Sequence, residues 1–510
     1  MTASGPLHTL IALAVLLEIA LSGCHKEVIP DPPSEITEPG GLQLDGAEGF
    51  LDKATRTLMF PLPADTVPEY SAFVQYLDYE SMWFNGTALI HGQENQLGKV
   101  AVSQRYPLVA MEGSQTDTLF VVFTKFPLMR IRINTDIRDE PKSLCNIQIQ
   151  SYEAGGDEDG ATVFKSLAGI EFRGKSSTRY EKKSYGVELW EDESASDYNA
   201  PLLGLRSAED WILDAMYVDR SRIRNKLSFD LWEKLARIPN ASQAESIYPG
   251  VRSRYVELFI NDSYEGVYNL TEKLDAQLLQ FNKYQYETGG VIYKAIEWGN
   301  GSTTFDSCCT PVPVEFVWEG WEQIYPGEMV MWEPLDSLRS VVVNSDDEEF
   351  SEKITGMIDL NNLVDYYLYI NVLMAWDNAG KNTFLVRYNA SHPFFILPWD
   401  VEASWGRMWD GTDSKSFGKV TNHLFDRIIE TNTGNFNGLL EARWKELRSS
   451  EFNAVELLGQ ASRYLSRLSE NGTIERENER WDLDIDIDAE FSYLSDWLEA
   501  RIDYLDNYFE

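Results

Sequence analysis

The chain has 510 residues, 43% of them hydrophobic, which is enough for more than one domain with a sizeable core. Its 44 lysine and arginine residues are outnumbered by 82 aspartate and glutamate residues, so the net charge is −38. A surface this acidic repels a phosphate backbone, which excludes nucleic acid as the main partner. The charge suits a basic protein substrate or a metal cation, although it also serves solubility alone.

The first 23 residues have the features of an export signal. Residues 7–22 form an apolar run that is too short for a comfortable membrane span. The run leads into LSGC, which has the form of a bacterial lipobox and places Cys24 where a lipid would be attached. Because Glu18 interrupts the run and no lysine or arginine precedes it, ordinary secretion is the alternative. We expect an exported bacterial lipoprotein, membrane-anchored through Cys24, in the periplasm or at the cell surface.

Two short regions separate this leader from the main domain. Residues 24–45 are rich in proline, glycine and acidic residues, which predicts a flexible tether. Residues 46–117 mix short apolar runs with turns and predict a small β-rich accessory region. The other cysteines, Cys145, Cys308 and Cys309, lack the spacing of a metal site and allow one disulfide with one free thiol.

From residue 118 onward the pattern predicts one larger α+β domain. Its first half, to about residue 275, contains apolar β-prone runs at 119–124, 128–134, 145–151, 169–173 and 183–190. A helix with an apolar residue at every fourth position follows over 221–237. A hairpin around Asn261 closes this half. Strands, helix and hairpin follow in the order found in the small lobe of a protein kinase.

The second half, from about residue 276 to 510, is predicted to be mostly helical. Residues 285–340 are rich in glycine and tryptophan and are expected to be loop-heavy. Asp359 is placed to cap a helix that ends near Met374. A stripe of leucine and aromatic residues predicts a further helix over 489–509.

The segment from 376 to 400 is the most informative. Two β-prone runs around the turn NASHP predict a hairpin that returns the chain to where it started. Asp377 and Asn382, before the first strand, should therefore lie near Asp400, after the second. Mg²⁺ prefers such oxygen ligands, and D-x-x-x-x-N is the spacing of the kinase catalytic loop, although its preceding His-Arg pair is absent. Turn-capping by the two aspartates is the alternative.

A basic cluster, RGKSSTRYEKKSY, begins at Arg173. Its glycine and Ser176 and Ser177 predict a turn that offers N–H and hydroxyl donors to phosphate. Lys182 or Lys183 opens the next strand and is placed to reach phosphate, as a kinase strand lysine does. The P-loop pattern G-x-x-x-x-G-K-[ST] is missing, and a solvated basic turn is the alternative.

Two acidic residues complete the candidate nucleotide site. Asp230, on the expected helix, is placed to pair with that lysine, as a kinase helix acid does. Glu272 ends the expected hairpin, where a kinase hinge would hold adenine. The alternatives are an exposed helix acid and an ordinary strand exit.

Together these segments resemble the CotH (spore coat protein H) kinase family. The matching stretches, in family order, are GIEFRGKSS, KKSYGVELW, DRSRIRNKLSFDLWEKL, YVELFINDSYEGVYNLTEKLD, MIDLNNLVDYYL, DNAGKN and LPWDVEASWG. The resemblance implies an atypical protein-kinase-like fold with two lobes. It also implies that ATP and a divalent metal, Mg²⁺ or Mn²⁺, are used to phosphorylate serine or threonine of secreted or spore-coat proteins.

By this resemblance Asp377 would be the catalytic aspartate, Asp400 the metal-binding aspartate and Asn382 a further metal ligand. The family often has a second aspartate two residues after the metal aspartate, where this chain has Glu402. Because a glutamate side chain is longer than that of aspartate, the sequence does not define how Glu402 would bind a metal.

The leading expectation is an exported, metal-dependent Ser/Thr kinase that acts on a secreted or surface protein, basic and serine-rich in keeping with the acidic chain. The main rival is a cell-surface binding or adhesion protein on a kinase-like scaffold, since fold does not fix function and an exported protein meets little ATP. A third reading makes Asp377 and Asp400 a glycosidase pair, which leaves the basic turn without a task.

Overall fold

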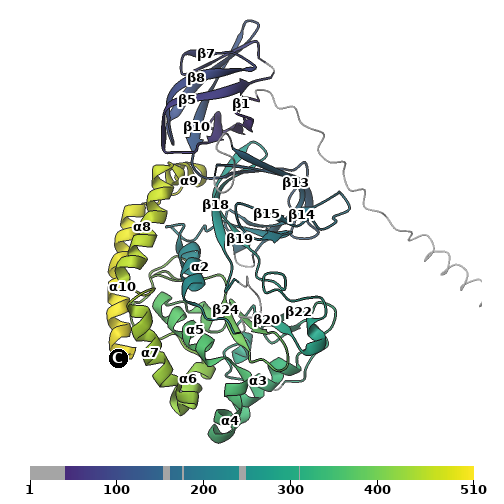
Figure 1. Ribbon diagram of the computed structural model, residues 1–510, viewed down its shortest axis with the longest axis vertical. Coiled ribbons are helices and arrows are strands. Elements are labelled where there is room, and N and C mark those ends of the chain that lie inside the picture. Colours follow the sequence, from purple (N-terminus) through teal and green to yellow (C-terminus); the bar gives the residue numbers. More distant parts are fainter. Residues whose placement is uncertain are drawn as a thin grey trace, which may run out of the picture.

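The computed structural model describes residues 41–77, 79–152, 161–174, 177–239, 248–308 and 310–509. The leader, Cys24, Ser176 and the side chain of Ser177 lie outside the described residues. Within those ranges no helix is long and apolar enough to cross a membrane. Figure 1 shows three parts stacked along the long axis: a β-sandwich, a β-barrel and a mostly helical part. The expected α+β class with a β-rich N-terminal region is confirmed.

The sandwich is made of two sheets that enclose one apolar core, to which Val74, Phe60 and Phe123 belong. One sheet contains β2 (Ala47–Glu48), β1 (Gln43–Leu44), β5 (Thr66–Gln75) and β8 (Gln93–Ala101). The other contains β3 (Phe50–Asp52), β4 (Thr57–Pro61), β10 (Gln115–Thr124), β9 (Arg105–Glu112), β6 (Ser81–Phe84) and β7 (Thr87–Leu89).

The limits of this first part differ from those expected. Strand β1 lies within the predicted tether, and β10 pairs with β9 and, in parallel, with β4. The run 119–124 therefore completes the sandwich and does not open the larger domain, so a boundary at residue 117 is wrong. The apolar pattern of a strand predicts its existence and its faces, but not its partners.

The barrel closes seven strands, with β11 parallel to β18 at the seam. Closure pairs every strand on both sides and leaves no free edge. In β14, which falls in the β-prone run 183–190, the alternate residues Tyr185, Val187 and Leu189 point into the barrel core. The strands are, in barrel order, β11 (Leu128–Arg132), β12 (Ser143–Ser151), β13 (Thr162–Arg173), β14 (Ser184–Trp190), β17 (Asp210–Asp214), β19 (Ser263–Glu272) and β18 (Ser253–Ile260).

Helix α2 (Arg224–Leu235) follows β17 and the short pair β15 (Ala200–Pro201) and β16 (Ser207–Ala208). Its leucine stripe packs into the core of the helical part rather than into the barrel. The helix begins later than the expected residue 221 because the Asp219 carboxylate accepts hydrogen bonds from the backbone N–H groups of Ser221 and Arg224.

The segment expected to be loop-heavy supplies most of a five-stranded sheet and one helix. Three of its tryptophans, Trp318, Trp321 and Trp332, lie in the core, where Trp332 stacks on Tyr293 with ring centroids 5.3 Å apart. Aromatic packing thus orders a segment in which glycines weaken any local pattern. The sheet contains β21 (Val317–Trp318), β22 (Trp321–Tyr325), β20 (Val291–Ala295), β23 (Thr383–Arg387) and β24 (Phe395–Pro398).

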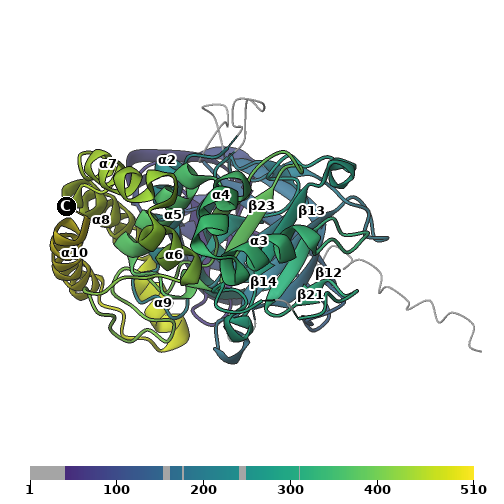
Figure 2. The same ribbon diagram turned by 90° about the horizontal axis from the view of Figure 1, so that it is seen from below.

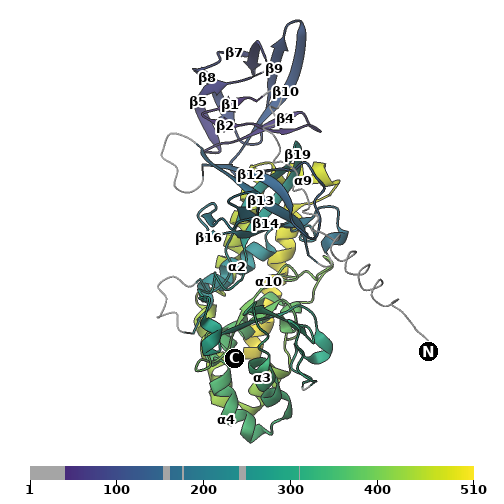
Figure 3. The same ribbon diagram turned by 90° about the vertical axis from the view of Figure 1, so that its right-hand side faces the viewer.

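The helices of the third part surround the buried helix α5, which Asp359 caps by accepting a hydrogen bond from the N–H of Asn362 at 2.8 Å, as predicted. In Figure 2, α7, α8 and α10 lie on the side opposite β21. Figure 3 shows α9 beside β19, at the level where the barrel meets the sandwich. The helices are α3 (Glu333–Asn344), α4 (Asp347–Met357), α5 (Leu360–Leu373), α6 (His423–Thr431), α7 (Phe436–Arg448), α8 (Ala454–Glu470), α9 (Thr473–Trp481) and α10 (Ile487–Phe509).

Among the described cysteines, Cys145 is a free thiol buried in the barrel core, and Cys308 is disulfide-bonded. Burial raises the pKa of the Cys145 thiol well above its ordinary value. Cys145 is therefore an inert core residue rather than a reactive thiol.

Candidate functional site

A cavity of about 510 Å³ lies between the barrel and the sheet of the helical part. Strands β13 and β17 of the barrel contribute Arg173 and Asp214 to its wall. The opposite wall comes from Lys294 on β20 and from the two ends of the β23–β24 hairpin. Five of the candidate site residues line this one cavity: Arg173, Lys182, Asp377, Asn382 and Asp400.

The β23–β24 hairpin brings Asp377, Asn382 and Asp400 to the cavity, as the sequence predicted. Thr383 pairs with Pro398, so Asn382 and Asp400 flank the open end of the hairpin. The Asn382 side chain donates a hydrogen bond to the Asp400 carbonyl at 3.3 Å. Asp377 lies one turn earlier, in the 3-10 helix η5 (Asp377–Ala379), where its carbonyl accepts from Lys381 N–H at 2.7 Å.

The backbone at this end of the hairpin is held in an unusual shape. Asn382 and Asp400 have left-handed φ angles of 54° and 47°, a region that Asn and Asp tolerate better than most residues. The buried Asn378 side chain donates to the carbonyls of Asn382 and Trp399, each at 2.9 Å. This clamp fixes the directions in which the two candidate ligands point.

Neither the Asp377 nor the Asp400 carboxylate forms a hydrogen bond or ion pair with any described residue. Both side chains keep contact with solvent in the cavity, Asp400 as an exposed residue and Asp377 as a half-buried one. Loss of bulk water raises the pKa of Asp377, and it raises the pKa of Asp400 to about 6 with help from the negative charge of Asp214. Lys381 opposes both shifts.

Two further acids add to this negative charge. Desolvation raises the pKa of Glu402 and of Asp214, and repulsion from Asp214 adds to the shift at Glu402. Asn225 ties their segments together, because its side chain donates to Asp214 at 2.9 Å and accepts from Val401 N–H at 2.8 Å. Asn225 thus holds the segments of these two acids in a fixed relative position.

Lys294 is a cavity residue that sequence reasoning missed. Its ammonium group forms no hydrogen bond or ion pair with a described residue and lies 5.6 Å from the Phe384 ring centroid and 5.8 Å from that of Trp399. Desolvation, reinforced by nearby Arg173, lowers its pKa to about 8. The available signal was one lysine inside the otherwise apolar run VIYKA, since an unpaired charge is rarely placed in a core strand.

The two lysines of the basic turn lie in different environments. Lys182 lines the cavity, but its ammonium group is buried and lies 2.6 Å from the Glu477 carboxylate and 2.6 Å from the Val267 carbonyl. Lys183 does not line the cavity. Its ammonium group donates to the carbonyls of Thr178 and Tyr180 and so closes the turn, which rules it out as a phosphate contact in this arrangement.

Asp230 and Glu272 do not belong to the cavity wall, contrary to expectation. Asp230 pairs with Lys226 one turn earlier at 2.8 Å and accepts from the Tyr464 hydroxyl. Glu272 is fully buried on β19, where its carboxylate pairs with Arg252 at 2.8 Å. Both carboxylates form ion pairs within the folded protein, and local sequence patterns do not reveal these partners.

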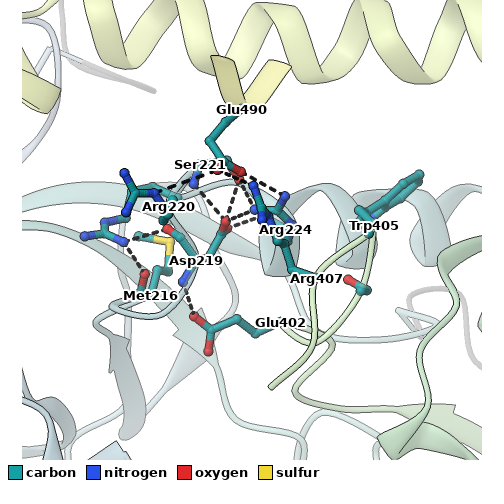
Figure 4. A network of polar contacts seen from close by, with 12 residues as sticks. Met216, Asp219, Arg220, Ser221, Arg224, Glu402, Trp405, Arg407 and Glu490 are labelled. Atoms are coloured by element: carbon teal, nitrogen blue, oxygen red, sulfur yellow. Dashed lines mark hydrogen bonds and ion pairs between the residues drawn. The ribbon is translucent and has the colours of Figure 1, made fainter. Parts of the chain in front are cut away.

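A polar network connects the cavity wall to the C-terminal helix (Figure 4). Glu490 on α10 pairs with Arg224 at 3.2 Å and with Arg407 at 2.5 Å. Arg224 also pairs with Asp219, whose backbone N–H donates to Glu402 at 3.1 Å. The network therefore holds the loop that carries Glu402 in place. Arg224, the first residue of α2, contributes to this by pairing with both Glu490 and Asp219.

No group of three or more His, Cys, Asp or Glu side chains in the described part of the chain is arranged to hold a metal ion. Asp400 and the amide of Asn382 nevertheless supply two oxygen ligands at one end of the hairpin. Mg²⁺ in phosphate-binding sites takes one or two protein carboxylates and fills its other positions with water and phosphate oxygens. The site fits a cation that arrives with phosphate, not one held in a protein cage.

Comparison with known proteins identifies the family. The sequence pattern described as "CotH kinase protein" matches residues 170–505. The inner spore coat protein H of Bacillus subtilis (strain 168) is 23% identical over 340 residues, covering 64% of this chain and 86% of that protein. The chain is thus a CotH-type α+β protein, and it belongs to the CotH kinase protein family. The β-sandwich lies outside the matched region.

Proposed function

We propose that this chain is an exported protein kinase that uses ATP and a divalent metal to phosphorylate serine or threonine in secreted or surface proteins. The observation that carries the proposal is that Asp377, Asp400, Lys294 and Lys381 face one cavity without a hydrogen-bonding or ion-pair partner among the described residues. Charges that are partly shielded from water and have no partner favour a ligand of opposite charge. The phosphates of ATP with a bound cation would pair with both kinds of charge.

The arrangement of the two parts supports a kinase-like reading. The barrel would form the smaller lobe, and the sheet with the surrounding helices the larger one, with the cavity between them. Family membership is further support. ATP binding between two lobes is the arrangement in which protein kinases position the γ-phosphate.

Each cavity residue has a task in this proposal. Asp377 would orient the hydroxyl of the substrate and accept its proton, a role that its raised pKa favours. Asp400 and Asn382 would hold the cation, which supplies charge neutralisation at the phosphates. Lys294 and Arg173 would bind phosphate oxygens. The rate increase would then come from positioning and electrostatic stabilisation rather than from a covalent intermediate.

Export and anchoring through Cys24 belong to the same proposal and are supported by the apolar leader and the LSGC sequence. A basic substrate is supported by the net charge of −38, and its serine or threonine residues would be the phosphate acceptors. The alternative, a surface binding protein on the same scaffold, would need no unpaired carboxylates in this cavity. The two readings differ in whether phosphate leaves ATP.

The direct test incubates the purified full chain with γ-labelled ATP, Mg²⁺ or Mn²⁺, and a basic serine-rich test protein. We expect label on serine or threonine of the chain or of the test protein with the wild type and not with Asp377→Asn. Stabilisation by ATP and metal without transfer would instead indicate a binding protein that has kept the nucleotide site. Neither stabilisation nor transfer would refute the proposal.

Replacing Lys294 with methionine is expected to raise the KM for ATP roughly 10- to 100-fold, the size of a lost hydrogen bond between a charged group and phosphate. The fold should survive, because the removed ammonium group has no hydrogen bond or ion pair with a described residue. Lys353→Met is the matched control, since Lys353 is exposed on α4 and pairs only with Glu349. Equal KM values for the two variants would remove Lys294 from the site.

A further inference from the structure

The lysine of the basic turn is held by an acid that lies 295 positions further along the chain. The Lys182 ammonium group and the Glu477 carboxylate are 2.6 Å apart, and neither side chain is exposed. Lys182 nevertheless forms part of the cavity wall. Glu477 is on α9, which packs against β19 of the barrel.

Glu477 is fixed by further contacts on both of its oxygens. One oxygen also accepts from Arg222 at 3.1 Å, and the other accepts from Val267 N–H at 3.0 Å. Gly266, with a φ of 95°, lets the carboxylate come this close, because a Cβ at that position would collide with it. The barrel is thus shaped to receive this one acid, with two buried cations around it.

We propose that Glu477 is a positioning residue that holds Lys182 at the cavity wall for the phosphates of the nucleotide. This inference rests on the proposed kinase function. In protein kinases a strand lysine is oriented by an acid on the helix of the small lobe. Here Asp230, the α2 acid expected to take this role, pairs with Lys226, and the acid that contacts Lys182 comes from α9 in the C-terminal helical segment.

Hydrogen bonds and an ion pair hold the start of α9 at the junction between the sandwich and the barrel. The buried Asn471 side chain, in the turn before α9, accepts from Lys125 N–H at 2.7 Å. One turn into α9, Arg476 pairs with Glu257 on β18. The placement of Glu477 therefore depends in part on a region that precedes the family match, which begins at residue 170.

The test compares Glu477→Gln with Glu257→Gln in the full chain. Both changes neutralise a buried acid that joins the barrel to α9, but only Glu477 contacts Lys182. We expect Glu477→Gln to lower kcat/KM for ATP by about 10- to 100-fold, mostly through KM, and Glu257→Gln to lower it by less than about threefold. Glu477→Asp keeps the charge and should recover part of the loss. Melting temperatures are measured for all three variants.

Equal kinetic losses for Glu477→Gln and Glu257→Gln at equal losses of melting temperature would show that Glu477 only stabilises the fold, and the inference would fall. If Glu477→Gln does not fold, Glu477→Asp is compared with Glu257→Gln instead. The inference then requires that Glu477→Asp has the higher KM for ATP. A wild type that binds ATP but transfers no phosphate would refute the kinase proposal alone. The ATP affinities of the variants would then still show whether Glu477 positions Lys182 for the phosphates. A wild type that binds no ATP would overturn both.

Discussion

Asp377→Asn is expected to lower the rate of phosphate transfer by roughly 10²- to 10⁴-fold, the usual contribution of a positioned general base. The amide keeps the size of the side chain but cannot accept the proton of the substrate hydroxyl. Because the Asp377 carboxylate has no hydrogen bond to a described residue, the change should disturb neither the fold nor the affinity for ATP. Steady-state kinetics at saturating ATP, with a separate measurement of ATP binding, gives both numbers.

Asp410→Asn is the matched control for this variant. Asp410 lies on the loop that follows the hairpin, and its carboxylate accepts hydrogen bonds from the N–H and hydroxyl groups of Thr412 in the same loop. Its replacement should leave the transfer rate unchanged. If Asp377→Asn keeps the wild-type rate, Asp377 is not the base.

Asp400→Asn should abolish metal-dependent stabilisation by ATP and lower kcat/KM by roughly 10²- to 10³-fold, the effect expected when one main electrostatic contact to the reacting group is lost. The asparagine retains one oxygen but not the negative charge that binds a divalent cation. Melting temperature with ATP, with and without Mn²⁺, is the simplest readout. A Mn²⁺-dependent shift equal to that of the wild type would exclude Asp400 as a metal ligand.

The raised pKa of Asp400 leads to a prediction about how stabilisation by ATP and metal depends on pH. The pKa of Asp400 is raised to about 6, so the folded protein binds this proton more tightly than the unfolded chain does. The contribution of this group to stability therefore falls as pH rises from about 4 to about 6, and the charged form is under strain above that range. A cation at Asp400 competes with the proton, so ATP with Mn²⁺ should raise the melting temperature more at pH 7.5 than at pH 5. Asp400→Asn should lose this difference.

The hairpin that forms the acidic end of the site was predictable because all of its determinants are local. Two β-prone runs and the turn between them specify its strands, and antiparallel return then places Asp377, Asn382 and Asp400 together. The cap at Asp359 and the alternation in β14 were predictable for the same reason. Each depends on residues within one turn or one strand.

What the sequence did not reveal depends on partners far along the chain. The lysine partner was sought on α2, at the position that a kinase helix would use, whereas Glu477 comes from the C-terminal segment. Strand β10 was predicted, but its pairing with β4 was not, because strand patterns carry no information about neighbours. Lys294 was missed because the one signal, a lysine inside the apolar run of β20, does not show which residues face it across the cavity.

The most direct test of the account is a crystal structure with Mn²⁺ and a non-hydrolysable ATP analogue, in which the anomalous signal of manganese locates the cation. We expect a manganese peak at roughly 2.1 Å from oxygens of Asp400 and Asn382, the distance typical of such a small oxygen-bound cation, with the terminal phosphate facing Asp377. Lys294 should contact the phosphates. A nucleotide bound outside the cavity, or a cavity left empty at saturating nucleotide and metal, would contradict the account.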